Sequence, residues 1–123
     1  MIVFDTSLLV DALASPRRSL PDLMRALEQG EPLLLCSMVA YEWMRGPRIS
    51  QELSVQESLF PTASALPFEA ADAEIAARLY RTVRRARTRE ADIAIAACAI
   101  RHQARLWTLN KADFADIPGV RLY

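Results

Sequence analysis

Short apolar segments alternate with longer segments of helical periodicity along this chain, and this alternation limits the folds open to it. A short apolar run rich in β-branched residues is typical of a strand buried on both faces, while apolar residues recurring every three to four positions indicate a helix. The predicted strands are residues 2–5, 33–36, 64–67 (the weakest), 106–109 and 120–122. The predicted helices are residues 7–14, 19–30 with Ser19 as the N-cap, 37–44, 49–60, 69–87 and 89–103, with Thr88 as a cap and a helical turn at 111–115. Strands that alternate with helices predict an α/β fold, a three-layer sandwich in which helices flank a mostly parallel central sheet.

The size and charge of the chain narrow the class of protein further. A chain of 123 residues suits one domain, residues 1–123, with a proper hydrophobic core. Because 52% of the residues are hydrophobic and 24% are charged, the composition is that of a folded domain. The 15 basic and 15 acidic residues cancel, which argues against binding of nucleic acid through bulk charge alone.

Neither a membrane span nor a disulfide framework is expected. The longest apolar run, residues 93–100, is much shorter than the roughly 20 residues that cross a bilayer. The N-terminus lacks the basic region of a secretory signal. Cys36 and Cys98 both lie in apolar stretches, without a CxxC spacing or a neighbouring histidine. We therefore expect a cytoplasmic protein with two buried, reduced thiols and no membrane partner.

Four acidic residues fall where the predicted strands lead into helices. Asp5 ends the first strand, and Glu42 lies in the first turns of the helix after the second strand. Asp92 is near the start of the helix 89–103, and Asp113 follows the fourth strand by four residues. Because ligands bind at the carboxyl ends of parallel strands, we expect these four carboxylates to converge there. Such a cluster raises carboxyl pKa values or binds a cation, and its hard oxygen ligands suit Mg²⁺ or Mn²⁺.

Each of these acids also has a structural interpretation. Asp92 is an ordinary helix-dipole partner, Glu42 fits the solvent face of an amphipathic helix, and Asp113 fits a turn. Asp5 differs, because a carboxylate inside an apolar run is costly unless it is paired. The set of four therefore indicates function more strongly than any single member.

Four segments of the chain resemble the motifs of the PIN-domain family in order and spacing. They are IVFDTSLLVD, CSMVAYEWMRG, READIAIAACA and TLNKADFADIPGVRLY, and the likeness runs from residue 1 to residue 123. The subgroup that they resemble is the VapC-type toxin ribonucleases of toxin–antitoxin pairs. The resemblance implies a PIN-like fold, Mg²⁺-dependent endoribonuclease activity (Mn²⁺ as a second option), RNA as the substrate and a cognate antitoxin protein as a partner. We also expect a homodimer.

The resemblance also assigns roles to particular residues. It implies that Asp5, Glu42 and Asp92 are the central metal-binding acids and that Asp113 is the more variable fourth acid. Asp5 and Asp92 are the candidate direct metal ligands, while Glu42 and Asp113 would hold a water or a second ion. The candidate pocket residues implied in the same way are Thr6, Thr108 and Asn110. The loop before Asp92 departs from the family pattern, because the sequence RRARTRE stands where a glycine often falls.

Six arginines lie within residues 78–89, in the half of the chain where positive charge collects. Residues 1–74 carry 5 basic and 11 acidic side chains, whereas residues 75–123 carry 10 basic and 4 acidic ones. The stretch fits a solvated helix face paired with the acidic half, and it equally fits a platform for RNA phosphates. Because an acidic site needs a positive rim to attract a polyanion, we take Arg84 and Arg85 as candidate substrate-binding residues.

Two other classes of protein remain to be separated from a nuclease. A non-catalytic PIN-like module that binds RNA or a protein is one, although such a module has no need of mutually repelling carboxylates. A phospho-acceptor receiver domain is the other, but the only lysine, Lys111, is not at the strand end where a receiver requires it. Covalent catalysis has no support, because Ser7 and Ser37 lack a partner base.

Overall fold

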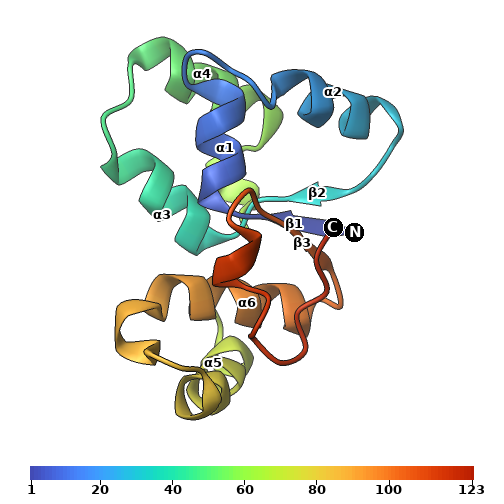
Figure 1. The fold of residues 1–123 in the computed structure, drawn as a ribbon. Coiled ribbons are helices and arrows are strands. Elements are labelled where there is room, and N and C mark those ends of the chain that lie inside the picture. The colour runs from blue at the N-terminus through green and yellow to red at the C-terminus, as the bar shows by residue number, and fades with distance from the viewer.

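A parallel three-stranded sheet forms the middle layer of the computed structural model, which describes residues 1–123 (Figure 1). The strands are β1 (Ile2–Phe4), β2 (Leu33–Leu34) and β3 (Arg105–Trp107), in the order β2-β1-β3. In this register Val3 pairs with Leu34 on one side and with Leu106 on the other. Every residue of the central strand β1 is fully buried, which is why its sequence is a continuous apolar run rather than an alternating one.

Two further segments extend the sheet by one bridge each. Leu66 pairs with Cys36 next to β2, and Leu122 pairs with Leu106 of β3, both in parallel. The predicted strands 64–67 and 120–122 are therefore reduced to single bridges. For the first of them, Ser64 belongs to the 3-10 turn Thr62–Ser64, and Pro67 lacks the N–H that would continue the ladder.

Helices cover both faces of the sheet, which confirms the predicted three-layer α/β class (Figure 1). On one side lie α1 (Thr6–Leu13), α2 (Leu20–Glu28) and α4 (Ser50–Leu59), and on the other lie α5 (Ala70–Thr82) and α6 (Glu90–Arg101). The remaining helix, α3 (Ser37–Arg45), contacts both α1 and α6. None of these helices has the length and the apolar composition that crossing a bilayer requires.

The predicted helix 69–87 is wrong at its C-terminal end, because α5 stops at Thr82. The Thr82 hydroxyl bonds the carbonyl oxygens of residues 78 and 79, which competes with continuation of the helix. The chain then turns through Arg85 in a left-handed conformation (φ 50°) and a 3-10 turn, Ala86–Thr88. Thr88 is not the cap of α6, since Arg89 holds that position. The arginine stretch is thus divided between a helix and a loop.

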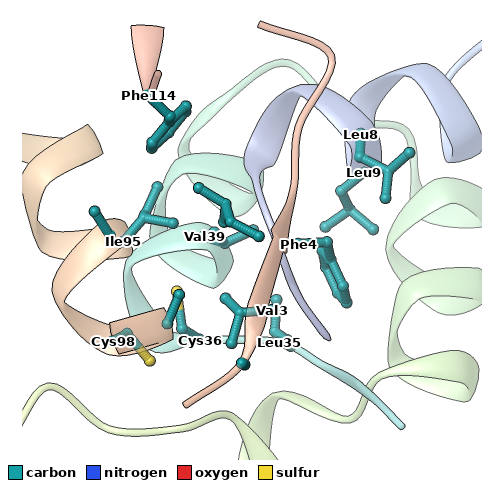
Figure 2. Close-up of a cluster of buried hydrophobic side chains, with 14 of the residues drawn as sticks. Val3, Phe4, Leu8, Leu9, Leu35, Cys36, Val39, Ile95, Cys98 and Phe114 are labelled. Atoms are coloured by element: carbon teal, nitrogen blue, oxygen red, sulfur yellow. The ribbon is translucent and has the colours of Figure 1, made fainter. Parts of the chain in front are cut away.

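Apolar side chains from both helical layers meet around the central strand (Figure 2). Val3 and Phe4 of β1 lie among side chains of α1, α3 and α6, and Cys36 and Cys98 are buried free thiols in this core. The core holds the C-terminal end of β1 in place, and the next residue along the chain is Asp5.

Candidate functional site

Asp5 lies between β1 and α1, and its carboxylate is almost completely buried. The Thr6 backbone N–H donates a hydrogen bond to Oδ1 at 2.7 Å. The hydroxyls of Ser7 and Thr108 both donate to Oδ2 at 2.8 Å. These three donors offset the cost of burying the carboxylate and fix its orientation, while Oδ1, which accepts only one of them, keeps a lone pair for a further ligand.

The hydroxyls that hold Asp5 also join the start of α1 to the segment after β3. The Leu109 N–H donates to Ser7 Oγ at 3.1 Å, and the Asn110 N–H donates to Thr108 Oγ1 at 3.0 Å. Thr108 is buried, whereas Asn110 is exposed and reaches this cluster through its backbone. Ser7 was not among the predicted site residues. A hydroxyl in the first turn of a helix that follows a buried acid is the signal that points to it.

Glu42 is tied to the same end of the sheet through Thr6. The Thr6 hydroxyl donates to Glu42 Oε1 at 2.6 Å, which links α1 to α3. Arg45, one turn further along α3, lies 3.5 Å from Glu42 Oε2. Asp5 and Glu42 are therefore anchored to consecutive residues at the start of α1.

Asp92 and Asp113 line a cleft of about 510 Å³ beside this cluster. Asp92 is in the first turn of α6, and Asp113 ends the 3-10 turn Lys111–Asp113 after β3. No hydrogen bond or ion pair engages the carboxylate of Asp92. The predicted Arg84 and Arg85 line the same cleft, and its other lining residues are Thr88, Arg89, Ala112 and Asp116.

The charges of the other three predicted acids act on Asp92. The pKa of Asp92 is raised from its ordinary 3.8 to about 6, first by burial and then by the negative charges of Asp5, Asp113 and Glu42. The positive charge of Arg89 opposes this rise in the pKa of Asp92 without cancelling it. The structure thus gathers these side chains into one region of excess negative charge.

The side chains fit a hard divalent cation in chemistry, although they do not close around one. No three His, Cys, Asp or Glu side chains lie close enough together to hold a metal ion by themselves. The site does offer carboxylate oxygens, an unengaged Asp92 and a local surplus of negative charge, which are what Mg²⁺ and Mn²⁺ favour. Because Mg²⁺ keeps several waters and takes only one or two carboxylates, a loose arrangement suits it.

Asp116 is a cleft residue that no sequence pattern indicates. Its two carboxylate oxygens accept hydrogen bonds from Arg89 at 2.6 and 3.0 Å. The hydrogen bonds from Arg89 lower the pKa of the Asp116 carboxyl. The partners are 27 residues apart in the sequence, so only the fold brings them together.

Comparison with known proteins gives one family and a consistent group of structures. The family model described as "PIN domain" matches residues 2–120. The fold is similar to the crystal structure of DNA-bound VapBC from Salmonella typhimurium, with a TM-score of 0.79 and 18% identity over 99% of this chain and 96% of that one. It is also similar to VapBC2 from Rickettsia felis bound to a promoter DNA fragment, with a TM-score of 0.73 and 20% identity over 100% and 98% of the two chains. A toxin–antitoxin complex from Klebsiella pneumoniae matches with a TM-score of 0.71 and 26% identity over 98% and 95%. No curated protein matches this chain in sequence.

The raised pKa of Asp92 predicts a gain in stability when its charge is removed. Between pH 4 and pH 6 the folded protein binds more protons at Asp92 than the unfolded chain does, so this group destabilises the fold as the pH rises through that range. Allowing for solvent screening at a half-exposed side chain, we expect Asp92→Asn to raise the free energy of unfolding by about 1 kcal/mol at pH 7 without divalent ions. The gain should vanish below about pH 4. Urea unfolding at several pH values measures it.

Glu90→Gln is the matched control for this prediction. Glu90 is an exposed acid in the same turn of α6, so its replacement loses a similar interaction with the helix dipole but relieves no cluster. It should be neutral or slightly destabilising. An Asp92→Asn protein no more stable than Glu90→Gln at pH 7 would contradict the clustering of charge.

Proposed function

Because this chain belongs to the PIN-domain family, we propose that it is the endoribonuclease toxin of a toxin–antitoxin pair. Its substrate is RNA, whose phosphodiester bonds it hydrolyses with Mg²⁺, or Mn²⁺, bound among Asp5, Glu42, Asp92 and Asp113. The similar structures are VapBC proteins and a toxin–antitoxin complex, which supports this class of function.

The observation that carries the proposal is the juxtaposition of opposite charges along one cleft. Asp92 and Asp113 lie on the lining together with Arg84 and Arg85. The acids suit a divalent cation, and the arginines suit the phosphates of a polyanion. A receiver domain or a metal-free binding module has no need for both charges in one cleft.

Asp5 and Asp92 are the proposed direct ligands of the metal, and Glu42 and Asp113 would hold a water or a second ion. A bound Mg²⁺ supplies a water of lowered pKa and neutralises charge on the phosphate. The protein contributes a preset geometry: Ser7 and Thr108 hold the Asp5 carboxylate, and Thr6 holds Glu42. Arg84 and Arg85 would hold the RNA backbone beside these acids.

The alternative function is a non-catalytic PIN-like module that binds RNA or a protein through the same surface. The raised pKa of Asp92 argues against it, because a binding surface gains nothing from carboxylates that repel one another. Cleavage of purified RNA that depends on a divalent ion separates the two functions.

Asp5→Asn tests the proposed metal site directly. The change keeps the shape of the side chain and removes one charge, so the fold should survive. RNA cleavage with Mg²⁺ should fall by at least about 100-fold, since a ligand is lost. Asp22→Asn, at an exposed carboxylate of α2 paired with Arg25, is the control and should cleave like the wild type. Wild-type cleavage by folded Asp5→Asn protein would exclude this site.

Arg84 and Arg85 are tested by the salt dependence of RNA binding. Replacing both with Gln should weaken binding and flatten the slope of log K against log salt by about 0.7 for each lost phosphate contact. Arg81→Gln is the control, because Arg81 lies on a separate hollow between α5 and α6 with Phe68 and Tyr80. An unchanged slope in the Arg84/Arg85 variant would show that these arginines are solvated surface residues that do not contact RNA phosphate.

The proposed partner is a small antitoxin protein whose C-terminal segment covers the acidic site and reaches it with an Arg or Lys. Exposed apolar side chains on α3 and α4, among them Tyr41, Met44 and Leu53, are proposed to contact it.

We further propose a homodimer and a cytoplasmic location. Expressed alone the protein should arrest growth, and expressed with the gene upstream it should co-purify with that product. Light scattering of the isolated toxin should give twice the 13.8 kDa of one chain. Harmless expression without any co-purifying partner would contradict the pairing.

A further inference from the structure

Arg89 stands at the N-cap position of α6, and unlike the neighbouring arginines its side chain is turned inward. Only 16% of it is exposed. Nη2 donates to Asp116 Oδ1 at 2.6 Å and to the Asp113 carbonyl oxygen at 2.7 Å. Nη1 donates to Asp116 Oδ2 at 3.0 Å and to the Arg84 carbonyl oxygen at 2.9 Å. These four bonds match the four terminal N–H groups of the guanidinium, an arrangement that a lysine cannot reproduce.

The four bonds connect three segments that line the cleft of Asp92 and Asp113. They join the start of α6, which carries Asp92, to the loop at residue 84 and to residues 113–116 after β3. Phe114 anchors the last of these segments in the core. The bonds from Arg89 then fix the orientation of the residues on either side of Phe114, namely Asp113 and Asp116. The carbonyl that Arg89 bonds belongs to Asp113 itself.

Arg89 makes no hydrogen bond to the carboxylates of the two cleft acids that it lies beside. Its guanidinium lies within electrostatic reach of Asp92, yet it makes no hydrogen bond to the Asp92 carboxylate or to that of Asp113. Asp116 instead occupies the edge of the guanidinium that Nη1 and Nη2 form, with one carboxylate oxygen on each nitrogen. Two carboxylates that repel each other are thus held on one cleft while their oxygens stay free for another ligand.

We propose that Arg89, held by Asp116, is a positioning residue that keeps Asp92 and Asp113 directed into the cleft without binding either carboxylate. The proposal rests on the proposed function where it concerns turnover. It gives Arg89 a role in the binding of a divalent cation by these acids. Arg84 and Arg85 have a different proposed role, which is to contact RNA phosphate.

Arg89→Lys is the main test, because it keeps the charge and removes the fork. Arg87→Gln is the matched control, at an exposed arginine of the same loop that lies off the cleft lining. Asp116→Asn is a second variant, which weakens the Arg89–Asp116 pair by changing the other partner. It provides the test if Arg89→Lys does not fold. The measurements are kcat and KM for RNA cleavage, Mn²⁺ affinity by electron paramagnetic resonance without RNA, and amide hydrogen exchange of residues 111–116.

We expect Arg89→Lys to lower kcat and Mn²⁺ affinity by about tenfold or more, with KM for RNA within about threefold of the wild type. Asp116→Asn should act in the same direction, both should speed exchange in residues 111–116, and Arg87→Gln should change none of these. Raised KM with unchanged kcat and Mn²⁺ affinity would make Arg89 a phosphate ligand and overturn the proposal. Equal behaviour of the folded Arg89→Lys and Arg87→Gln proteins would overturn it too.

The design separates this inference from the proposed function. If the wild type cleaves no RNA, the nuclease proposal fails, but Mn²⁺ affinity and amide exchange still report on Arg89. If the wild type cleaves RNA and the two Arg89–Asp116 variants do so equally well, only the positioning role fails.

Discussion

The burial of one carboxylate governs the architecture of this site. Asp5 lies where the apolar strand β1 gives way to α1, and it is tolerated there because a backbone N–H and two hydroxyls satisfy its oxygens. The donors come from two layers of the fold, since Thr108 follows β3 of the sheet while Ser7 belongs to α1. The requirement to satisfy a buried charge thus ties the end of the sheet to the helical layer. Thr6, between the two, carries the connection on to α3.

Around this fixed carboxylate the protein keeps charges that oppose its own stability. Asp92 is half-buried among three other acids, which raises its pKa and makes its ionised form unfavourable. A chain selected for stability alone has no reason to retain that arrangement, whereas a chain that binds a cation gains from it. Arg89 offsets part of the repulsion while its hydrogen bonds stay on Asp116 and on backbone oxygens. Arg89 thus reduces the electrostatic cost of the acidic cluster and leaves the carboxylate of Asp92 free to bind a ligand.

Local patterns predicted the framework, and long-range contacts account for what they missed. The apolar runs and helical periodicities indicated the parallel sheet and its two helical layers, and the apolar context of Asp5 marked it as unusual. The predicted end of α5 was wrong because the chain leaves the helix after Thr82 and turns through the left-handed Arg85, and helical periodicity does not register that turn. The pairing of Arg89 with Asp116 was missed because it joins residues far apart in the sequence. The sequence of an arginine-rich run also does not indicate which of its side chains face water and which face a carboxylate. Ser7 could have been predicted from the sequence, because its hydroxyl lies two residues after a buried acid.

The narrowness of the sheet has a consequence for how other molecules attach to this protein. Beyond β2 and β3 the sheet continues only through the single bridges at Leu66 and Leu122. Neither edge presents a row of free backbone groups long enough to template an added strand, which is the usual route to β-augmentation and to edge-to-edge aggregation. Recognition is left to side chains on helices and on the loops at the carboxyl ends of the strands. Loops and helix surfaces tolerate sequence change better than buried strands do, so the binding properties of such a fold can change without disturbing the strands beneath.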